Sequence, residues 1–330
     1  MKEAQRDEAG HRPESGNDAG TLRTSGSGPR IEPRTAQWEA DLVLRDALPT
    51  GTADSWDELN HLDENYLEFS MTSDILRGLM IWLGLVGLAS LIFVVSLMWD
   101  DIVGGVVGGI LVTAFAGVLL GPMCLFLLRF DLRLPKDRPV RFNRRRGKVY
   151  ANTYTRNHNP FGRWQGGVNV FDWRALQAEV TKHVGVSGEI ITQRYNLDLV
   201  VCKPEEHGRY EEVERFRLQQ GAQTIGQYAE QWEFIRRYMN HGLEGLPKQS
   251  LRDRNPAFVD CLMFMMPWFA PTEAGRRFRQ RHRNPFVVFF MLLMAIPFPL
   301  WLIFGLGNYA VMKIAPEAVW PREVDEESRR

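Results

Sequence analysis

Hydrophobic and polar positions are sharply segregated along this chain. Three stretches, residues 78–99, 102–128 and 286–312, carry no charged residue and are 22, 27 and 27 residues long. A helix needs about 20 apolar residues to cross a bilayer, and core helices of water-soluble proteins are usually shorter than this. The first two stretches therefore predict a transmembrane helical hairpin within residues 76–128.

The third uncharged stretch has a different character because it contains Pro297 and Pro299. Proline removes a backbone donor and kinks a helix, so residues 286–312 predict either a kinked C-terminal membrane helix or a re-entrant hairpin. Before it, residues 251–285 form an apolar and basic connector. Within the connector, residues 255–272 are apolar apart from Asp260. They predict an interfacial or re-entrant segment, or a core helix of the neighbouring domain.

The N-terminal region predicts little ordered structure. Residues 1–54 are rich in Gly, Ser, Thr, Pro and charged residues, a composition that buries too little apolar surface to offset ordering entropy. We expect a disordered tail there, and no cleavable signal peptide, because no apolar core follows a basic start. Residues 55–75 predict an amphipathic lead-in, with a short acidic helix over residues 55–70. Ser55 would cap that helix and Glu58 would lie at its third position.

Charge near the uncharged stretches predicts their orientation. Only Asp100 and Asp101 separate the first two stretches, whereas residues 129–156 hold ten basic and two acidic residues. Another basic run, "RRFRQRHR", precedes the third stretch. Because basic residues beside membrane spans stay in the cytoplasm, we expect a multi-pass membrane protein. Its N-terminus and central region would be cytoplasmic, and a single third span would place the tail, residues 313–330, outside.

The basic run after the second stretch also predicts binding. Lys and Arg clusters beside membrane helices attract anionic lipid headgroups. Nucleic acid is a disfavoured partner, because 40 basic residues balance 40 acidic ones and no stacking platform or recognition motif is present. The residues expected to contact anionic lipid are Arg141, Arg144, Arg145, Arg146 and Lys148.

Residues 129–250 predict a mostly antiparallel cytoplasmic β module capped by a helix. "PVRFNRRRGKVYANTY" indicates two strands around a turn, with Gly147 in the left-handed position. "GGVNVFDW", "EIITQRYNLDLVVCKP" and "EEVERFRLQQG" indicate further strands, and "DWRALQAEVTKHV" a strand or a short helix. "GQYAEQWEFIRRYMNHG" has helical periodicity and stops at Gly242. The predicted class is an α+β membrane protein, and the order of elements suggests a pleckstrin-homology-like roll.

Two helix faces are candidate contact surfaces. In the second stretch, small residues recur at every fourth position, which lets helix backbones approach closely in lipid. The partner of that face is either the first span or a second copy of the chain. The predicted helix-packing residues are Gly105, Gly109, Thr113, Gly117 and Gly121. The apolar face of the helix before Gly242 is the predicted partner face, formed by Tyr228, Trp232, Ile235 and Met239.

Candidate chemistry is sparse. Cys124, Cys202 and Cys261 lack metal-motif spacing, and the seven histidines form no paired-ligand motif. No nucleophile elbow, phosphate loop or dinucleotide fingerprint is present. The sequence therefore predicts a non-enzymatic membrane protein that needs no cofactor or metal and binds another protein. The alternative is a membrane-embedded transporter or enzyme that uses Asp260, since an acid within a membrane is usually functional.

Several short motifs resemble one known family. "FNRRRGKVY", "FDW" with "AEV", "YNLDLVV" and above all "WEFIRRYM" resemble a domain-of-unknown-function family of bacterial inner-membrane proteins, over residues 59–312. The resemblance implies an association with type VI secretion, and hence an immunity or accessory role toward a secreted toxin. It carries over no functional residue, because these motifs have no known chemistry.

Overall fold

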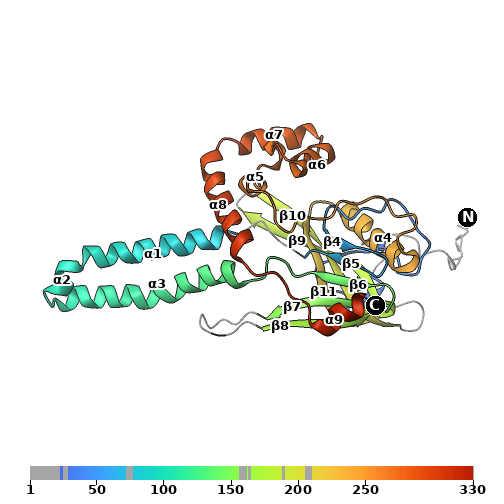
Figure 1. The fold of residues 1–330 in the computed structure, drawn as a ribbon, viewed down its shortest axis with the longest axis horizontal. Helices are drawn as coiled ribbons and strands as arrows, with labels where there is room; N and C mark the ends of the chain where they lie inside the picture. Colours follow the sequence, from blue (N-terminus) through green and yellow to red (C-terminus); the bar gives the residue numbers. More distant parts are fainter. Residues whose placement is uncertain are drawn as a thin grey trace, which may run out of the picture. The chain divides into compact units, whose positions relative to one another are not determined.

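The computed structural model describes residues 23–24, 29–71, 77–155, 162, 165–187, 190–204 and 210–329 (Figure 1). It is a mixed α+β protein that divides into two compact units. Unit 1 comprises Met1–Asp54 and Arg174–Leu246, and unit 2 comprises Ser55–Trp173 and Pro247–Arg330. The single β module predicted over residues 129–250 is therefore wrong, because its strands belong to two different sheets.

Unit 1 is built on a curled six-stranded sheet in the order β1-β3-β9-β10-β11-β2. The three long strands form an antiparallel meander, which confirms the strands predicted there and resolves residues 176–187 as a strand. β2 pairs with β11 while β3, only a few residues later, pairs with β9, so the sheet curls. The strands are β1 (Arg23–Thr24), β2 (Ile31–Glu32), β3 (Trp38–Asp41), β9 (Leu176–Ser187), β10 (Ile190–Pro204) and β11 (Tyr210–Ala222).

The disordered tail predicted over residues 1–54 is wrong for residues 29–54, while residues 1–22 and 25–28 lie outside the described part. Ile31 packs against Val200 and Cys202 of β10, and Trp38 and Leu42 are buried. These few apolar residues find their partners more than 130 positions away in the sequence. Composition predicted disorder because it counts local apolar residues and cannot include such distant contacts.

One face of the unit 1 sheet carries a buried row of charges. Asp41, Glu179 and Asp198 are direct cross-strand neighbours on β3, β9 and β10, and all three are buried. Arg215 forms an ion pair with Glu179. The Trp38 indole donates to Asp41 at 2.7 Å. Burial raises the pKa of Glu179 to about 7, the neighbouring Asp41 and Asp198 carboxylates add to that rise, and Arg215 opposes it.

Unit 2 contains a five-stranded antiparallel sheet in the order β4-β5-β6-β7-β8. Its buried apolar face includes Leu67, Phe69, Val140, Phe142 and Val149. The predicted β6–β7 hairpin is confirmed, with Gly147 at φ 62° in its turn. The strands are β4 (Leu59–Leu62), β5 (Tyr66–Phe69), β6 (Val140–Asn143), β7 (Lys148–Thr155) and β8 (Gln165–Asp172).

The acidic helix predicted over residues 55–70 is wrong, because β4 and β5 form a hairpin there. The Asp63 carboxylate accepts hydrogen bonds from the backbone N–H groups of Asn65 and Tyr66, at 2.7 and 2.9 Å. An aspartate that binds the backbone two residues ahead favours a turn over a helix. Burial of Leu59 and Leu67 in the sheet then outweighs the local helical pattern.

The apolar helical hairpin is inserted between two neighbouring strands of unit 2. Its two long helices, α1 and α3, lie side by side (Figure 1) and are long and apolar enough to cross a membrane. The chain leaves the sheet after β5 and returns at β6, and Phe69 pairs directly with Val140. Both ends of the hairpin are therefore on one side. The helices are α1 (Leu79–Leu97), α2 (Trp99–Val103) and α3 (Val107–Arg133).

The third apolar stretch is sharply bent. α7 and α8 are inclined by 88° at the break near Pro297, which confirms the predicted kink. α5, within the predicted apolar connector, packs against α8 where Gly305 meets the Leu262 backbone. The remaining elements of unit 2 are α5 (Phe258–Leu262), η5 (Pro267–Phe269), α6 (Glu273–Arg281), α7 (Pro285–Met294), α8 (Phe298–Ile314) and α9 (Arg322–Arg329).

Both flanks of this bent pair attach to the same part of unit 2. Before it, Arg281 forms an ion pair with Asp57, just ahead of β4, at 2.8 Å. After it, Asp325 of α9 binds Arg141 of β6 at 3.1 Å. A single crossing would separate these flanks, whereas a re-entrant hairpin would keep them on one side. Of the two predicted arrangements of α7 and α8, these contacts favour the re-entrant one.

The buried Glu179 predicts a pH-dependent stability of unit 1. Because its folded pKa is raised above the unfolded value, its stabilising contribution is complete below about pH 4.5 and is lost as pH rises through 7. We expect the free energy of unfolding to fall by on the order of 2 kcal/mol between pH 5 and 8. Denaturant titration of the detergent-solubilised protein at several pH values measures this change.

Glu179→Gln should abolish this part of the pH dependence, because the amide stays neutral at both pH values. The matched control is Glu212→Gln, since Glu212 also binds Arg215 but is not fully buried. An unchanged pH slope in Glu179→Gln would contradict the assignment.

Candidate functional site

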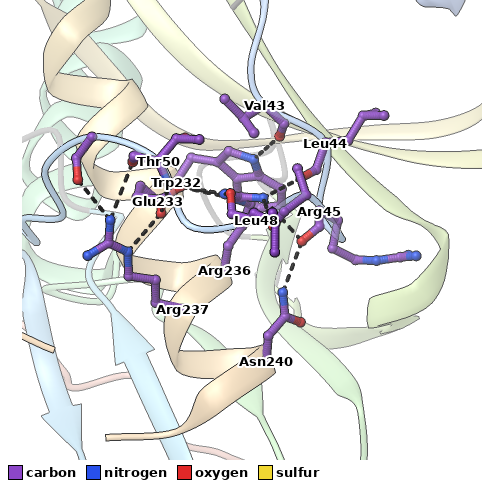
Figure 2. Close-up of polar contacts among 12 residues, drawn as sticks. Val43, Leu44, Arg45, Leu48, Thr50, Trp232, Glu233, Arg236, Arg237 and Asn240 are labelled. Carbon is purple, nitrogen blue, oxygen red and sulfur yellow. Dashed lines mark hydrogen bonds and ion pairs between the residues drawn. The ribbon is translucent and has the colours of Figure 1, made fainter. Parts of the chain in front are cut away.

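The most elaborate polar site lies in unit 1, where helix α4 (Ile225–His241) holds a loop (Figure 2). The Trp232 indole donates to the Val43 carbonyl at 2.7 Å. The buried Arg236 guanidinium donates to the carbonyls of Ala47 and Leu48 at 3.0 and 3.3 Å, and also to that of Leu44. We call Trp232, Glu233, Arg236, Arg237 and Asn240 the α4 clamp, and residues 43–51 the clamped loop.

Glu233 is the charged centre of the α4 clamp. Its carboxylate binds Arg236 at 2.6 Å and Arg237 at 2.7 Å, and it accepts the Thr50 backbone N–H at 2.9 Å. Arg237 also donates to the Gly51 carbonyl at 2.8 Å. A buried charge is tolerated only when it is paired and hydrogen-bonded. The α4 clamp meets this condition internally, so it acts as a structural support for the clamped loop.

The predicted partner face on α4 is not a free surface. Tyr228, Trp232, Ile235 and Met239 are all buried, and α4 packs against β9, β10 and β11. The predicted helix, its boundaries and its stop at Gly242 are confirmed, but its apolar face belongs to the core of unit 1. An apolar helical face has the same periodicity whether it meets the protein's own sheet or another protein.

The predicted lipid-contact residues divide into two groups. Arg144, Arg145, Arg146 and Lys148 are exposed at the β6–β7 turn and its edge. Arg141, in contrast, is buried and not available to a lipid headgroup: it pairs with Glu68 at 3.0 Å. The difference arises because the C-terminal tail covers Arg141 through Trp320 and Asp325, whereas Arg144, Arg145 and Arg146 lie in the turn beyond the strand.

Arg141 is the centre of a cluster that attaches the C-terminal tail to the sheet. Its guanidinium lies over the rings of Tyr66 and Trp320, at 4.2 and 4.6 Å from their centroids. The Trp320 indole donates to Glu68 at 2.9 Å. Further along the tail, the Tyr150 hydroxyl donates to the Glu327 carboxylate at 2.6 Å. We call this group the tail cluster; it comprises Tyr66, Glu68, Arg141, Tyr150, Trp320 and Glu327.

At the base of the apolar hairpin, three helices meet on small residues. The Asp131 carboxylate accepts the backbone N–H groups of Gly78 and Ile81 at 3.1 and 3.0 Å, which satisfies the start of α1. A Cβ on Gly78 would lie 2.3 Å from the Asn308 nitrogen of α8. A Cβ on Gly307 would meet Gly78 and Trp82. These contacts join α1, α3 and α8 tightly.

The predicted small-residue row on α3 is only partly used inside the chain. Gly105 precedes α3, in the turn, at φ 71°, and Gly109 packs against Asp101. Thr113 is partly buried, and a Cβ on Gly117 or Gly121 would meet nothing within 4 Å. Close packing of α1 on α3 comes instead from two glycines of α1 that the spacing rule did not select, Gly84 and Gly87.

Asp260 occupies a structural position. It lies on α5 and accepts a hydrogen bond from the Thr272 hydroxyl, and Thr272 in turn caps α6 by accepting the Gly275 N–H at 3.3 Å. Cys124, Cys202 and Cys261 are buried as free thiols. Within the described part of the chain, no group of three His, Cys, Asp or Glu side chains could hold a metal ion.

Sequence reasoning missed Arg236, Glu68 and Asp131. Arg236 lies one helical turn after Trp232, on the same face of α4. This spacing could have indicated that Arg236 is buried together with Trp232. Glu68 alternates with the apolar Leu67 and Phe69, a pattern that becomes visible once a strand is assumed. Asp131 is one of only two acids in a strongly basic segment, an anomaly that indicates a specific partner.

Comparison with known proteins gives one result. The family model described as "Family of unknown function (DUF6708)" matches residues 118–330. The match extends through the tail, which the motif resemblance over residues 59–312 did not include, and begins within α3. No curated protein and no solved structure matches the chain.

Removal of Arg236 should destabilise unit 1 more than removal of its neighbour. Arg236→Met leaves several buried carbonyls without a donor, and we expect a loss of about 3 kcal/mol. Arg237→Met is the matched control, because Arg237 is partly exposed and water can replace it at a cost of about 1 kcal/mol. Denaturant midpoints measure both, and limited proteolysis should cut the clamped loop earlier in Arg236→Met. Equal effects of the two substitutions would contradict this role.

The glycines of the hairpin should respond according to the helix they belong to. Gly84→Ile places carbon against Leu128 and should destabilise the monomer by about 2 kcal/mol through overpacking. Gly117→Ile faces open space, so we expect normal monomer stability and a loss of self-association if a second copy packs there. Thermal midpoints and cross-linking in detergent measure the two effects, with Val118→Ile as the control. Unchanged cross-linking in Gly117→Ile would eliminate this interface.

Proposed function

We propose, from the premise that this chain belongs to DUF6708, a family of unknown function, that it is a non-enzymatic integral membrane protein. It resides in the bacterial inner membrane and holds a protein-binding module at the cytoplasmic face. The observation that carries this proposal is the insertion of the apolar hairpin between β5 and β6, two paired neighbours of one sheet. A membrane that holds the hairpin would therefore also hold the sheet at its surface.

The side chains of the hairpin support a lipid environment. Val107, Phe115 and Val118 of α3 are between 68% and 77% exposed, and comparable apolar side chains cover α1. So large an exposed apolar surface marks a membrane or protein contact site in a protein of this size. Length and the absence of charge along both helices favour the membrane.

A binding role is supported by the way the polar clusters are organised. The α4 clamp and the tail cluster pair their buried charges within the chain, which gives rigid supports but no poised acid, base or nucleophile of the kind that catalysis requires. Exposed surfaces such as the basic β6–β7 turn remain for a partner. The curled sheet of unit 1, followed by α4, keeps a pleckstrin-homology-like roll as our finer proposal for unit 1.

The partner we propose is a secreted toxin or a component of its secretion system. Support for this finer proposal comes from the motif resemblance alone. An immunity or accessory protein needs a stable, membrane-held surface more than chemistry, which agrees with the rigid supports described above. A transport or enzymatic role through Asp260 has no comparable support, because its carboxylate accepts a hydrogen bond from Thr272, the residue that caps α6.

The predicted topology tests membrane anchoring directly. Because the native cysteines are buried, single introduced cysteines can report accessibility to an impermeant maleimide. Val103→Cys, in the hairpin turn, should react in intact spheroplasts. Arg144→Cys and Arg322→Cys should react only after lysis, because the β6–β7 turn and α9 belong to the same cytoplasmic unit. Reaction of Arg322→Cys in intact spheroplasts would contradict the return of α7 and α8.

The partner proposal requires a cellular test. Deletion of the gene should leave growth unchanged but make cells sensitive to sister cells with an active secretion system, or reduce toxin secretion. Complementation with the wild-type chain should restore resistance to the attacking cells and normal toxin secretion. Equal competition and normal secretion by the deletion strain would reject the toxin-related role without affecting the topology result.

A further inference from the structure

A basic hollow lies beside helix α6 in unit 2. It is lined by Trp268, Arg276, Arg279, Gln280 and Arg283. Its wall is fixed, because Gly275 packs so closely on the preceding turn that a Cβ there would lie 2.2 Å from the Ala270 carbonyl oxygen. Arg279 donates to the carbonyls of Trp268 and Ala270 at 2.7 and 2.9 Å. Trp268 is thus held against α6.

The lining of this hollow is strongly positive. It includes three arginines and no carboxylate. The closest acid on α6, Glu273, is exposed and 3.5 Å from Arg276. The other two arginines of α6, Arg277 and Arg281, pair instead with Asp57. Arginine side chains that line one hollow favour a phosphate-like anion, because guanidinium groups pair with phosphate oxygens.

The environment of the hollow favours a phosphate attached to lipid. α7 begins two residues after Arg283, and its Phe286 and Phe289 are 72% and 65% exposed. α8 continues from α7 to the base of the apolar hairpin, where Gly307 meets Gly78. An aromatic indole beside arginines, next to an exposed apolar helix, is typical of the interface between headgroups and acyl chains.

We propose that the hollow binds the phosphodiester headgroup of an anionic phospholipid, with Arg276 and Arg283 as the principal contacts. Arg279 positions Trp268, and the acyl chains lie along Phe286 and Phe289 of α7. The proposal rests on the membrane anchoring proposed above but not on the toxin-related role. It places the lipid site on α6, away from the β6–β7 turn that the charge pattern of the sequence favoured.

The test uses the full-length protein in a neutral detergent. Phosphatidylglycerol or phosphatidylcholine is titrated in mixed micelles, and native mass spectrometry counts the bound lipid. We expect selective binding of phosphatidylglycerol, and an affinity about 30-fold weaker in Arg276→Gln/Arg283→Gln, because each basic residue near an anionic surface contributes about fivefold. Arg276→Lys/Arg283→Lys should retain most of the affinity, since the charge is kept.

The matched control is Arg194→Gln/Arg322→Gln, which removes two exposed arginines elsewhere. An equal loss of binding in this control would overturn the proposal in favour of a general charge effect. Equal binding of phosphatidylglycerol and phosphatidylcholine would also overturn it. Competition by inorganic phosphate at similar concentration would assign the hollow to a free anion instead of a lipid. If the protein shows no selective lipid binding but the maleimide experiment gives the expected topology, the lipid site is rejected and the proposal of membrane anchoring is kept.

Discussion

The pairing of β5 with β6 is the constraint on which unit 2 depends. Backbone hydrogen bonds fix Phe69 opposite Val140, although the whole apolar hairpin, Leu79–Arg133, lies between them in the sequence. Whatever surrounds the hairpin must therefore accept both of its ends beside the paired ends of two interior strands. The same sheet also receives the C-terminal tail through Arg141, so that α7 and α8 are held at both ends.

Small residues and single charges supply the precision at the hairpin base. Gly78, Gly307 and Asn308 bring the backbones of α1 and α8 into contact, and Asp131 satisfies the N–H groups at the start of α1. Exposed helix ends carry unsatisfied donors that are costly away from water. A carboxylate from α3 provides the acceptor, which couples the start of one long helix to the end of the other.

Two buried carboxylates elsewhere, Glu233 and Glu68, are each paired with arginines of their own unit. Glu233 is shared by Arg236 and Arg237, and Glu68 by Arg141 and Arg254. Such clusters are costly to break, because removal of one partner leaves the other charged group buried alone. These clusters stabilise the two units, and their charged groups are not available to a ligand. Ligand binding is therefore expected at the surface, where the basic hollow on α6 is the clearest candidate site.

The sequence by itself determined the elements whose signal is local and long. The uncharged stretches, the bend at Pro297, the strands β6, β7, β8, β10 and β11, and helix α4 with its stop at Gly242 all follow from periodicity, length and turn chemistry. Only the tertiary structure decided how these elements are shared between two sheets, why residues 29–54 are ordered, and that the apolar face of α4 is internal. The physical reason is that burial depends on contacts between residues far apart in the chain, such as Ile31 with Val200 and Trp232 with Val43, and no local pattern encodes the partner.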